Sequence, residues 1–111
     1  MDFHLNEEQL MIQHAVREFA RKELAPIAAQ LDRESRFPRE IIERMAAMDL
    51  FALPFSEDCG GTGDGYLAYV IAVEEISRAC ASTGITYAAH CSIGTGPIYL
   101  FGSEAQKQKW V

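Results

Sequence analysis

The sequence predicts an all-α fold, a helical up-and-down domain of about six helices with two hydrophobic helices at its centre. Apolar residues near the N-terminus recur at the 3.6-residue helical period. Two long, mostly apolar stretches follow at about residues 65–81 and 85–101, and no segment alternates convincingly as a half-buried strand does. The chain has 111 residues and is 49% hydrophobic, so it can bury a core and is expected to form one domain, 1–111.

The first forty residues predict the start of three helices. Asn6 is a good N-cap for the first helix. Pro26 is expected to end or restart that helix, which gives a short second helix over about 26–34, and Pro38 suits the first position of a third. One apolar stripe of the first helix consists of Ile12, Ala15, Val16, Phe19 and Ala20, whereas Arg17, Arg21 and Lys22 are expected to face away.

A turn-rich loop and a buried helix come next. The loop, about residues 50–65, contains Pro54 and four glycines. The fourth helix, about 65–81, is apolar on nearly all sides for eight residues, which is typical of a helix buried on most faces. Glu74 and Arg78 are expected to pair on its exposed side, and Glu75 to be solvated or to cap a neighbour. Gly84 is expected to close this helix.

The fifth helix, about 85–101, carries the strongest functional signal. Pro97 lacks an N–H and is expected to kink the helix, and Gly94 and Gly96 remove side chains from the same turn. A glycine inside a helix costs about 1 kcal/mol relative to alanine, so a close neighbour or a flat ligand should offset that cost. His90 lies one turn before Gly94 on the same face. The residues alone leave two interpretations open: a core histidine with glycines for helix packing, or a ligand pocket lined by Tyr87, His90 and Gly94.

Charge, cysteine content and segment lengths exclude several classes of protein. The net charge of −6 disfavours nucleic acid or an anionic membrane as a partner. Three cysteines without a CxxC pair indicate a reduced, intracellular protein. No apolar run reaches the roughly 20 residues of a membrane span, and the acidic N-terminus lacks signal-peptide or transit-peptide features, so a cytoplasmic location is expected. The sixth helix begins with a capping box at Ser103 and is interrupted at Val111, which predicts a fragment of a larger chain.

Common catalytic motifs are not supported by the spacing. His90 and Cys91 are adjacent, and so are Glu74 and Glu75; adjacent side chains on a helix point about 100° apart and cannot act as a pair. His14 and Glu18 alone do not make a metal site. The glycines of "CGGTGDG" lack the Lys-Ser/Thr ending and the preceding strand of a phosphate-binding loop, so a turn explains them better.

The order of these segments resembles the N-terminal helical domain of the acyl-CoA dehydrogenases over essentially the whole chain. The segment from "LNEEQL" to "CGG" resembles the family's opening helices and Pro–acidic–Gly-Gly loop, and "YVIAVEEISRACASTGI" resembles its fourth helix. "FGSEAQKQKWV" resembles the Phe-Gly-x-x-x-Gln-Lys-x-x-Tyr/Trp segment that normally leads into a β domain. The likeness is greatest to short-chain, butyryl-type members, whose "SAH–S" core is similar to Ala88–Ser92. Cys59 departs from the family's frequent tyrosine before Gly-Gly.

The resemblance implies an FAD-dependent enzyme that oxidises an acyl-CoA to its trans-2-enoyl-CoA and passes electrons to an electron-transfer flavoprotein. In the family a glutamate removes the α proton while a hydride leaves to the flavin. Whole members are usually tetramers of three-domain subunits, and the glutamate and nearly all flavin contacts lie in the later two domains. The 111-residue chain is therefore expected to be inactive alone, and it is assigned no catalytic, cofactor-binding or metal-ligating residue.

The same resemblance implies that this domain forms one wall of the slot for the acyl chain. Carried over position by position, the lining residues are expected to be Thr86, Tyr87, His90 and Gly94. A bulky Tyr87 and a polar His90 would shorten the slot, which favours a short, branched or cyclic acyl group. Two alternatives stay open: a stand-alone helical module that binds a partner without catalysis, and a relative such as an acyl-CoA oxidase or flavin monooxygenase.

Overall fold

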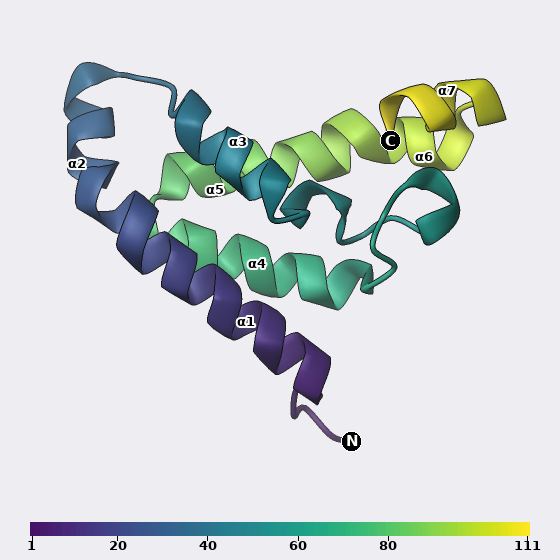
Figure 1. Cartoon of the computed structure of the whole chain (residues 1–111), viewed down its shortest axis with the longest axis horizontal. Coiled ribbons are helices and arrows are strands. Elements are labelled where there is room, and N and C mark those ends of the chain that lie inside the picture. The colour runs from purple at the N-terminus through teal and green to yellow at the C-terminus, as the bar shows by residue number, and fades with distance from the viewer.

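The all-α prediction is confirmed by a computed structural model that describes all 111 residues and contains only helices and connecting turns. Figure 1 shows α4 lying between α1 and α5, with α6 and α7 at one end of the molecule. The domain is flat, with extents of 41 × 36 × 22 Å. In chain order the elements are α1 (Glu7–Phe19), the π-helix η1 (Ala20–Leu24), α2 (Ala25–Glu34), α3 (Arg39–Ala47), the 3₁₀ turns η2 (Leu50–Ala52) and η3 (Glu57–Cys59), α4 (Gly65–Ala79), α5 (Ala81–Ala89), the π-helix η4 (His90–Thr95), α6 (Gly96–Phe101) and α7 (Glu104–Trp110).

The first two predicted helices form one continuous rod. Asn6 caps α1 with a complete capping box, because its side chain accepts from the Gln9 N–H and the Gln9 side chain accepts from the Asn6 N–H. Pro26 lies in the first turn of α2, where its missing N–H costs little. The π-helical turn η1 joins α1 to α2, so the proline restarts the helix without breaking the rod.

The prediction that Gly84 closes the fourth helix is wrong. Helix α4 ends at Ala79, Cys80 has an extended backbone, and Gly84 is a buried residue inside α5. A Cβ atom at Gly84 would overlap the side chain of Ser77 in α4. The glycine is therefore explained by the close approach of α4 and α5, which leaves no room for a side chain at this position.

The core lies between α1, α3, α4 and α5, and Leu50, Leu53 and Phe55 add to it from η2 and the turn that follows. Burial of these side chains removes apolar surface from water, the main favourable term in folding. The buried cluster consists of Val16, Ala20, Leu24, Leu31, Ile41, Met45, Leu50, Leu53, Phe55, Tyr69, Ala72, Ile76, Tyr87 and Cys91.

The kink predicted at Pro97 takes the form of a π-helical turn. Residues 81–101 form one rod in which η4 separates α5 from α6, and Pro97 lies in the first turn of α6. The Gly96 N–H donates to the Cys91 carbonyl, five residues back, as a π-helix requires. The wider turn keeps one face buried at every fourth residue: Thr83, Tyr87, Cys91 and Thr95.

The cysteines, the lengths of the apolar helices and the metal-ligating side chains can each be described from the structure. Cys59, Cys80 and Cys91 are all free thiols. No helix combines the length and apolar character that crossing a membrane demands. No three His, Cys, Asp or Glu side chains gather in a way that could hold a metal ion, and His14 with Glu18 is no exception.

Candidate functional site

Three of the four predicted site residues share one side of the α5–η4 rod. Thr86, His90 and Gly94 are spaced four residues apart; His90 and Gly94 are exposed and Thr86 is half-buried. The Thr86 hydroxyl donates to the Ser82 carbonyl of its own helix at 2.9 Å. A Cβ atom at Gly94 would meet only the Ala89 carbonyl oxygen, at 3.8 Å, so space is open there. This set forms a shallow polar strip, which we call the wall strip.

Tyr87 lies on the opposite, buried side of the same helix. Its side chain is 0% exposed, and its hydroxyl donates to the Leu50 carbonyl at 2.6 Å. Its ring also makes an edge contact with Tyr69, with centroids 5.5 Å apart. Burial raises the pKa of the Tyr87 phenol well above its ordinary value, so it stays a neutral donor. Tyr87 therefore lies on the core side of the helix that carries the wall strip, and its hydrogen bond holds that helix against η2.

An aromatic residue that the sequence did not single out contacts the wall strip. The ring of Phe51, in η2, lies 4.9 Å from the His90 ring at an interplanar angle of 77°. The same ring lies 5.2 Å from the Tyr87 ring at 78°. The segment "LFALPF" does not predict these contacts, because they join residues about forty positions apart in the chain.

The wall strip is an open surface of this domain. A hollow of about 330 Å³ between the segment 31–38 and α5 borders Thr86 but not Tyr87, His90 or Gly94. Large apolar side chains nevertheless continue along the rod in solvent, with Ile93 75% and Phe101 86% exposed. A second groove, about 350 Å³, lies between α6 and α7 and is lined by Pro97, Ile98, Phe101, Gly102, Gln106 and Trp110.

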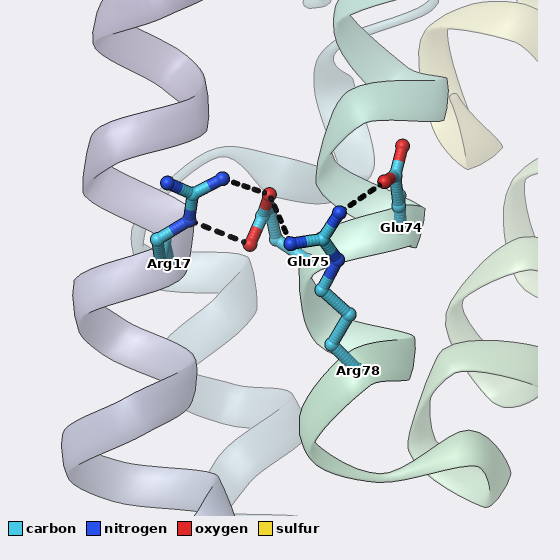
Figure 2. Close-up of polar contacts among 4 residues, drawn as sticks. All are labelled: Arg17, Glu74, Glu75 and Arg78. Carbon is cyan, nitrogen blue, oxygen red and sulfur yellow. Dashed lines mark hydrogen bonds and ion pairs between the residues drawn. The ribbon is translucent and has the colours of Figure 1, made fainter.

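The two acidic residues of α4 belong to a separate ion-pair cluster (Figure 2). The predicted Glu74–Arg78 pair is confirmed at 2.7 Å. Glu75, expected to be solvated or to cap a neighbour, is instead only 2% exposed, and Arg17, expected to face away, donates to both of its carboxylate oxygens at 2.8 and 3.1 Å. These expectations are wrong because α1 packs on α4 at this turn, and a buried carboxylate needs a charged partner. The hydrogen bonds from Arg17 hold the pKa of Glu75 below its ordinary value.

The side chains of His90 and Cys91 lie on different sides of the rod. Cys91 is buried, its thiol donates to the Phe51 carbonyl at 3.7 Å, and burial raises its pKa to about 11. A thiol held protonated in this way is a poor nucleophile. His90 lies on the exposed side of the rod, so the two side chains face different surroundings, solvent for His90 and the core for Cys91.

The buried polar side chains of the core are satisfied within the chain. Every buried side-chain nitrogen and oxygen already has a hydrogen-bond partner in the chain.

The structure defines an all-α domain in which the α5–η4 rod has one buried side and one side that faces solvent. A family profile described as "Acyl-CoA dehydrogenase, N-terminal domain" matches residues 6–111. The chain belongs to the acyl-CoA dehydrogenase family, within that family's N-terminal domain.

Individual relatives agree with this assignment. The chain is 44% identical over 111 residues to the short-chain specific acyl-CoA dehydrogenase of Clostridium acetobutylicum, covering 100% of this chain and 29% of the relative. Butyryl-CoA dehydrogenase from Megasphaera elsdenii superposes with a TM-score of 0.92 at 34% identity, over 99% of this chain and 30% of that one. A structure described as the electron transferring flavoprotein of Acidaminococcus fermentans contains a chain with a TM-score of 0.95 at 43% identity, over 99% and 29%. The chain thus spans less than a third of the length of these proteins.

Proposed function

We propose that this chain is the N-terminal domain of a longer, three-domain flavoenzyme that oxidises a short, branched or cyclic acyl-CoA to its 2-enoyl-CoA. Family membership supports the reaction class, and the likeness to short-chain and butyryl relatives supports a small acyl group. The structural observation that carries the proposal is the wall strip, with half-buried Thr86 and exposed His90 and Gly94, on a rod whose opposite side packs into the core.

In this proposal the wall strip forms one side of the acyl slot. Gly94 leaves space for the tail, and the His90 imidazole limits how far the tail extends. Tyr87 contributes from behind, because its bond to the Leu50 carbonyl fixes the rod on which the strip lies. Steric closure by His90 is needed, since a purely apolar pocket separates substrates by only about 1–3 kcal/mol per methylene.

The remaining chemistry belongs to polypeptide outside these 111 residues. There, FAD would supply the hydride acceptor and a glutamate would serve as the base for the α proton. The match to a chain in a structure described as an electron transferring flavoprotein supports such a protein as the electron acceptor. A homotetramer and a cytoplasmic location complete the proposal.

The exposed apolar side chains of α6 and α7 support contact with that missing polypeptide. Leu100 is 62%, Phe101 86% and Trp110 60% exposed, and the groove between the two helices is lined by some of the same residues. A contiguous apolar surface of this kind is typical of an interface. We assign it to the domains that follow in the full-length protein.

The test is anaerobic reduction of the full-length protein by a panel of acyl-CoA thioesters of increasing chain length. Loss of the oxidised-flavin absorbance with short acyl-CoAs is the expected result. His90→Glu should change the preferred chain length, while the matched variant His14→Glu, on α1, should leave it unchanged. Flavin that no acyl-CoA reduces would overturn the reaction, and an unchanged preference in His90→Glu would overturn the wall strip. Peroxide release in place of reduction of an electron-transfer flavoprotein would indicate an oxidase.

A further inference from the structure

The His90 side chain contacts an aromatic residue outside its own helix, Phe51. His90 is exposed, so burial alone does not select its side-chain rotamer. A helical residue of this type has two common χ1 rotamers, because the third clashes with the preceding turn. The Phe51 ring contacts the imidazole edge-on at a centroid distance of 4.9 Å, within the favourable range for such pairs. This contact favours one of the two rotamers.

Phe51 lies in a segment that is held to the α5–η4 rod by two hydrogen bonds, each from a side chain of the rod to a backbone carbonyl of η2. The carbonyl of the preceding residue, Leu50, accepts from the Tyr87 hydroxyl at 2.6 Å. The carbonyl of Phe51 accepts from the Cys91 thiol at 3.7 Å. The Tyr87 ring also meets the Phe51 ring edge-on at 5.2 Å. These contacts hold η2 against the buried side of the rod. Phe51, the one aromatic residue of η2, also contacts His90.

The geometry points to Phe51 as a positioning residue that sets the acyl chain length the enzyme accepts by holding the His90 imidazole in place. This inference rests on the proposed function, because it needs His90 to bound the acyl slot. Phe51 touches no substrate in this account. It acts only through His90, so its substitution changes discrimination between substrates while the chemistry of the flavin site is untouched.

The test is a double-mutant cycle in the full-length flavoenzyme. The measured quantity is the ratio of kcat/KM for a four-carbon to that for an eight-carbon acyl-CoA, in wild type, Phe51→Leu, His90→Ala and the double variant. Phe51→Leu is expected to change this ratio by roughly threefold to tenfold, the range that corresponds to one edge-to-face aromatic contact. In the His90→Ala background the same change should have no effect, because the group that Phe51 positions is gone.

Two further variants separate positioning from general destabilisation. Phe51→Tyr keeps the ring and should restore the wild-type ratio. Phe55→Leu is the matched control. Phe55 is a buried aromatic residue in the turn that follows η2, and its ring centroid lies 5.1 Å from that of Tyr99. It should lower the melting temperature without moving the ratio. An effect of Phe51→Leu that persists in the His90→Ala background, or no effect in wild type while His90→Ala changes the ratio, would overturn the role of Phe51. No effect of His90→Ala would instead overturn the wall strip itself.

Discussion

Gly84 and Gly94 lie on one helical rod, yet their surroundings differ. A Cβ atom at Gly84 would overlap Ser77 of α4, with the Ser77 Cα at 2.9 Å, whereas one at Gly94 would meet a single carbonyl oxygen at 3.8 Å. The first glycine is required by helix packing. The second removes a side chain from an exposed surface where packing does not demand it, which suits a surface that contacts a ligand.

Substitution of these two glycines by alanine should therefore have opposite effects on stability. Gly84→Ala is expected to destabilise the protein by about 1–3 kcal/mol, because the new methyl group forces α4 and α5 apart. Gly94→Ala is expected to be neutral or slightly stabilising, because alanine favours a helix by up to about 1 kcal/mol over glycine. Thermal unfolding of both variants gives the comparison. Equal losses of stability would show that the two positions are packed alike.

The Arg17–Glu75 pair predicts a pH dependence of stability. The pKa of Glu75 is lowered in the folded protein, mainly by hydrogen bonds from Arg17, so the folded state binds this proton less readily than the unfolded state. The stabilisation is complete above the ordinary glutamate pKa of 4.5 and is lost as pH falls through the lower folded value. Melting temperatures measured from pH 7 to pH 3 should fall less steeply on acidification in Glu75→Gln than in wild type. Parallel curves would contradict the pair's role.

The same pair should respond unequally to removal of each partner. Arg17→Met leaves a carboxylate that is 2% exposed with only the more distant Arg78, at 4.0 Å, as a counter-ion, whereas Glu75→Leu leaves only a partly exposed arginine. Arg17→Met is expected to lower the melting temperature more, and the double variant should be more stable than Arg17→Met alone. A double variant that shows the plain sum of the two losses would indicate that the residues do not interact.

Helices α1 and α7 begin where the sequence pattern places them, whereas the boundary between α4 and α5 and the irregular segments do not follow from that pattern. The stripe of Val16 and Ala20, the cap at Asn6 and the capping box at Ser103 were sufficient to locate α1 and the start of α7. The π-turn η4 was not predictable, because the signals of Gly94, Gly96 and Pro97 indicate an interruption without its form. Its position between α5 and α6 lets one rod keep a buried and an exposed side.

The shorter of the two hydrogen bonds that attach η2 to this rod is the buried one from Tyr87, at 2.6 Å. Tyr87→Phe removes the donor to the Leu50 carbonyl and leaves that buried oxygen without its partner. The expected cost is about 1–2 kcal/mol of unfolding free energy, measured by denaturant titration. Tyr66→Phe, at an exposed tyrosine on α4, is the matched control and should cost almost nothing. A Tyr87→Phe variant as stable as wild type would show that packing alone fixes η2.

For the candidate site, the sequence predicted the shared face of His90 and Gly94 from helical spacing, and the structure agrees. The orientation of Tyr87 was not apparent, because a tyrosine in an apolar run fits a pocket wall and a core equally well. Phe51 was missed entirely, since its contact with His90 depends on how η2 folds back on α5. The long-range ion pair of Arg17 with Glu75 was missed for the same reason: it joins residues 58 positions apart.

At the scale of the whole molecule, this domain is flat and leaves large apolar side chains in solvent. Ile93, Leu100, Phe101 and Trp110 are each at least 60% exposed. If later domains cover them in the full-length protein, the isolated 1–111 fragment should bind a hydrophobic dye strongly and Phe101→Ser should reduce that binding. The full-length protein should bind little dye with or without the substitution. Weak dye binding by the fragment would contradict an interface on α6 and α7.

The most direct measurement is a crystal structure of the full-length protein with a non-reactive short-chain acyl-CoA analogue bound. The account predicts that the end of the acyl chain lies in van der Waals contact, about 4 Å, with the His90 imidazole, and that Thr86 and Gly94 border the same slot. An acyl chain enclosed by other elements, with His90 left in solvent or covered by another domain, would contradict it.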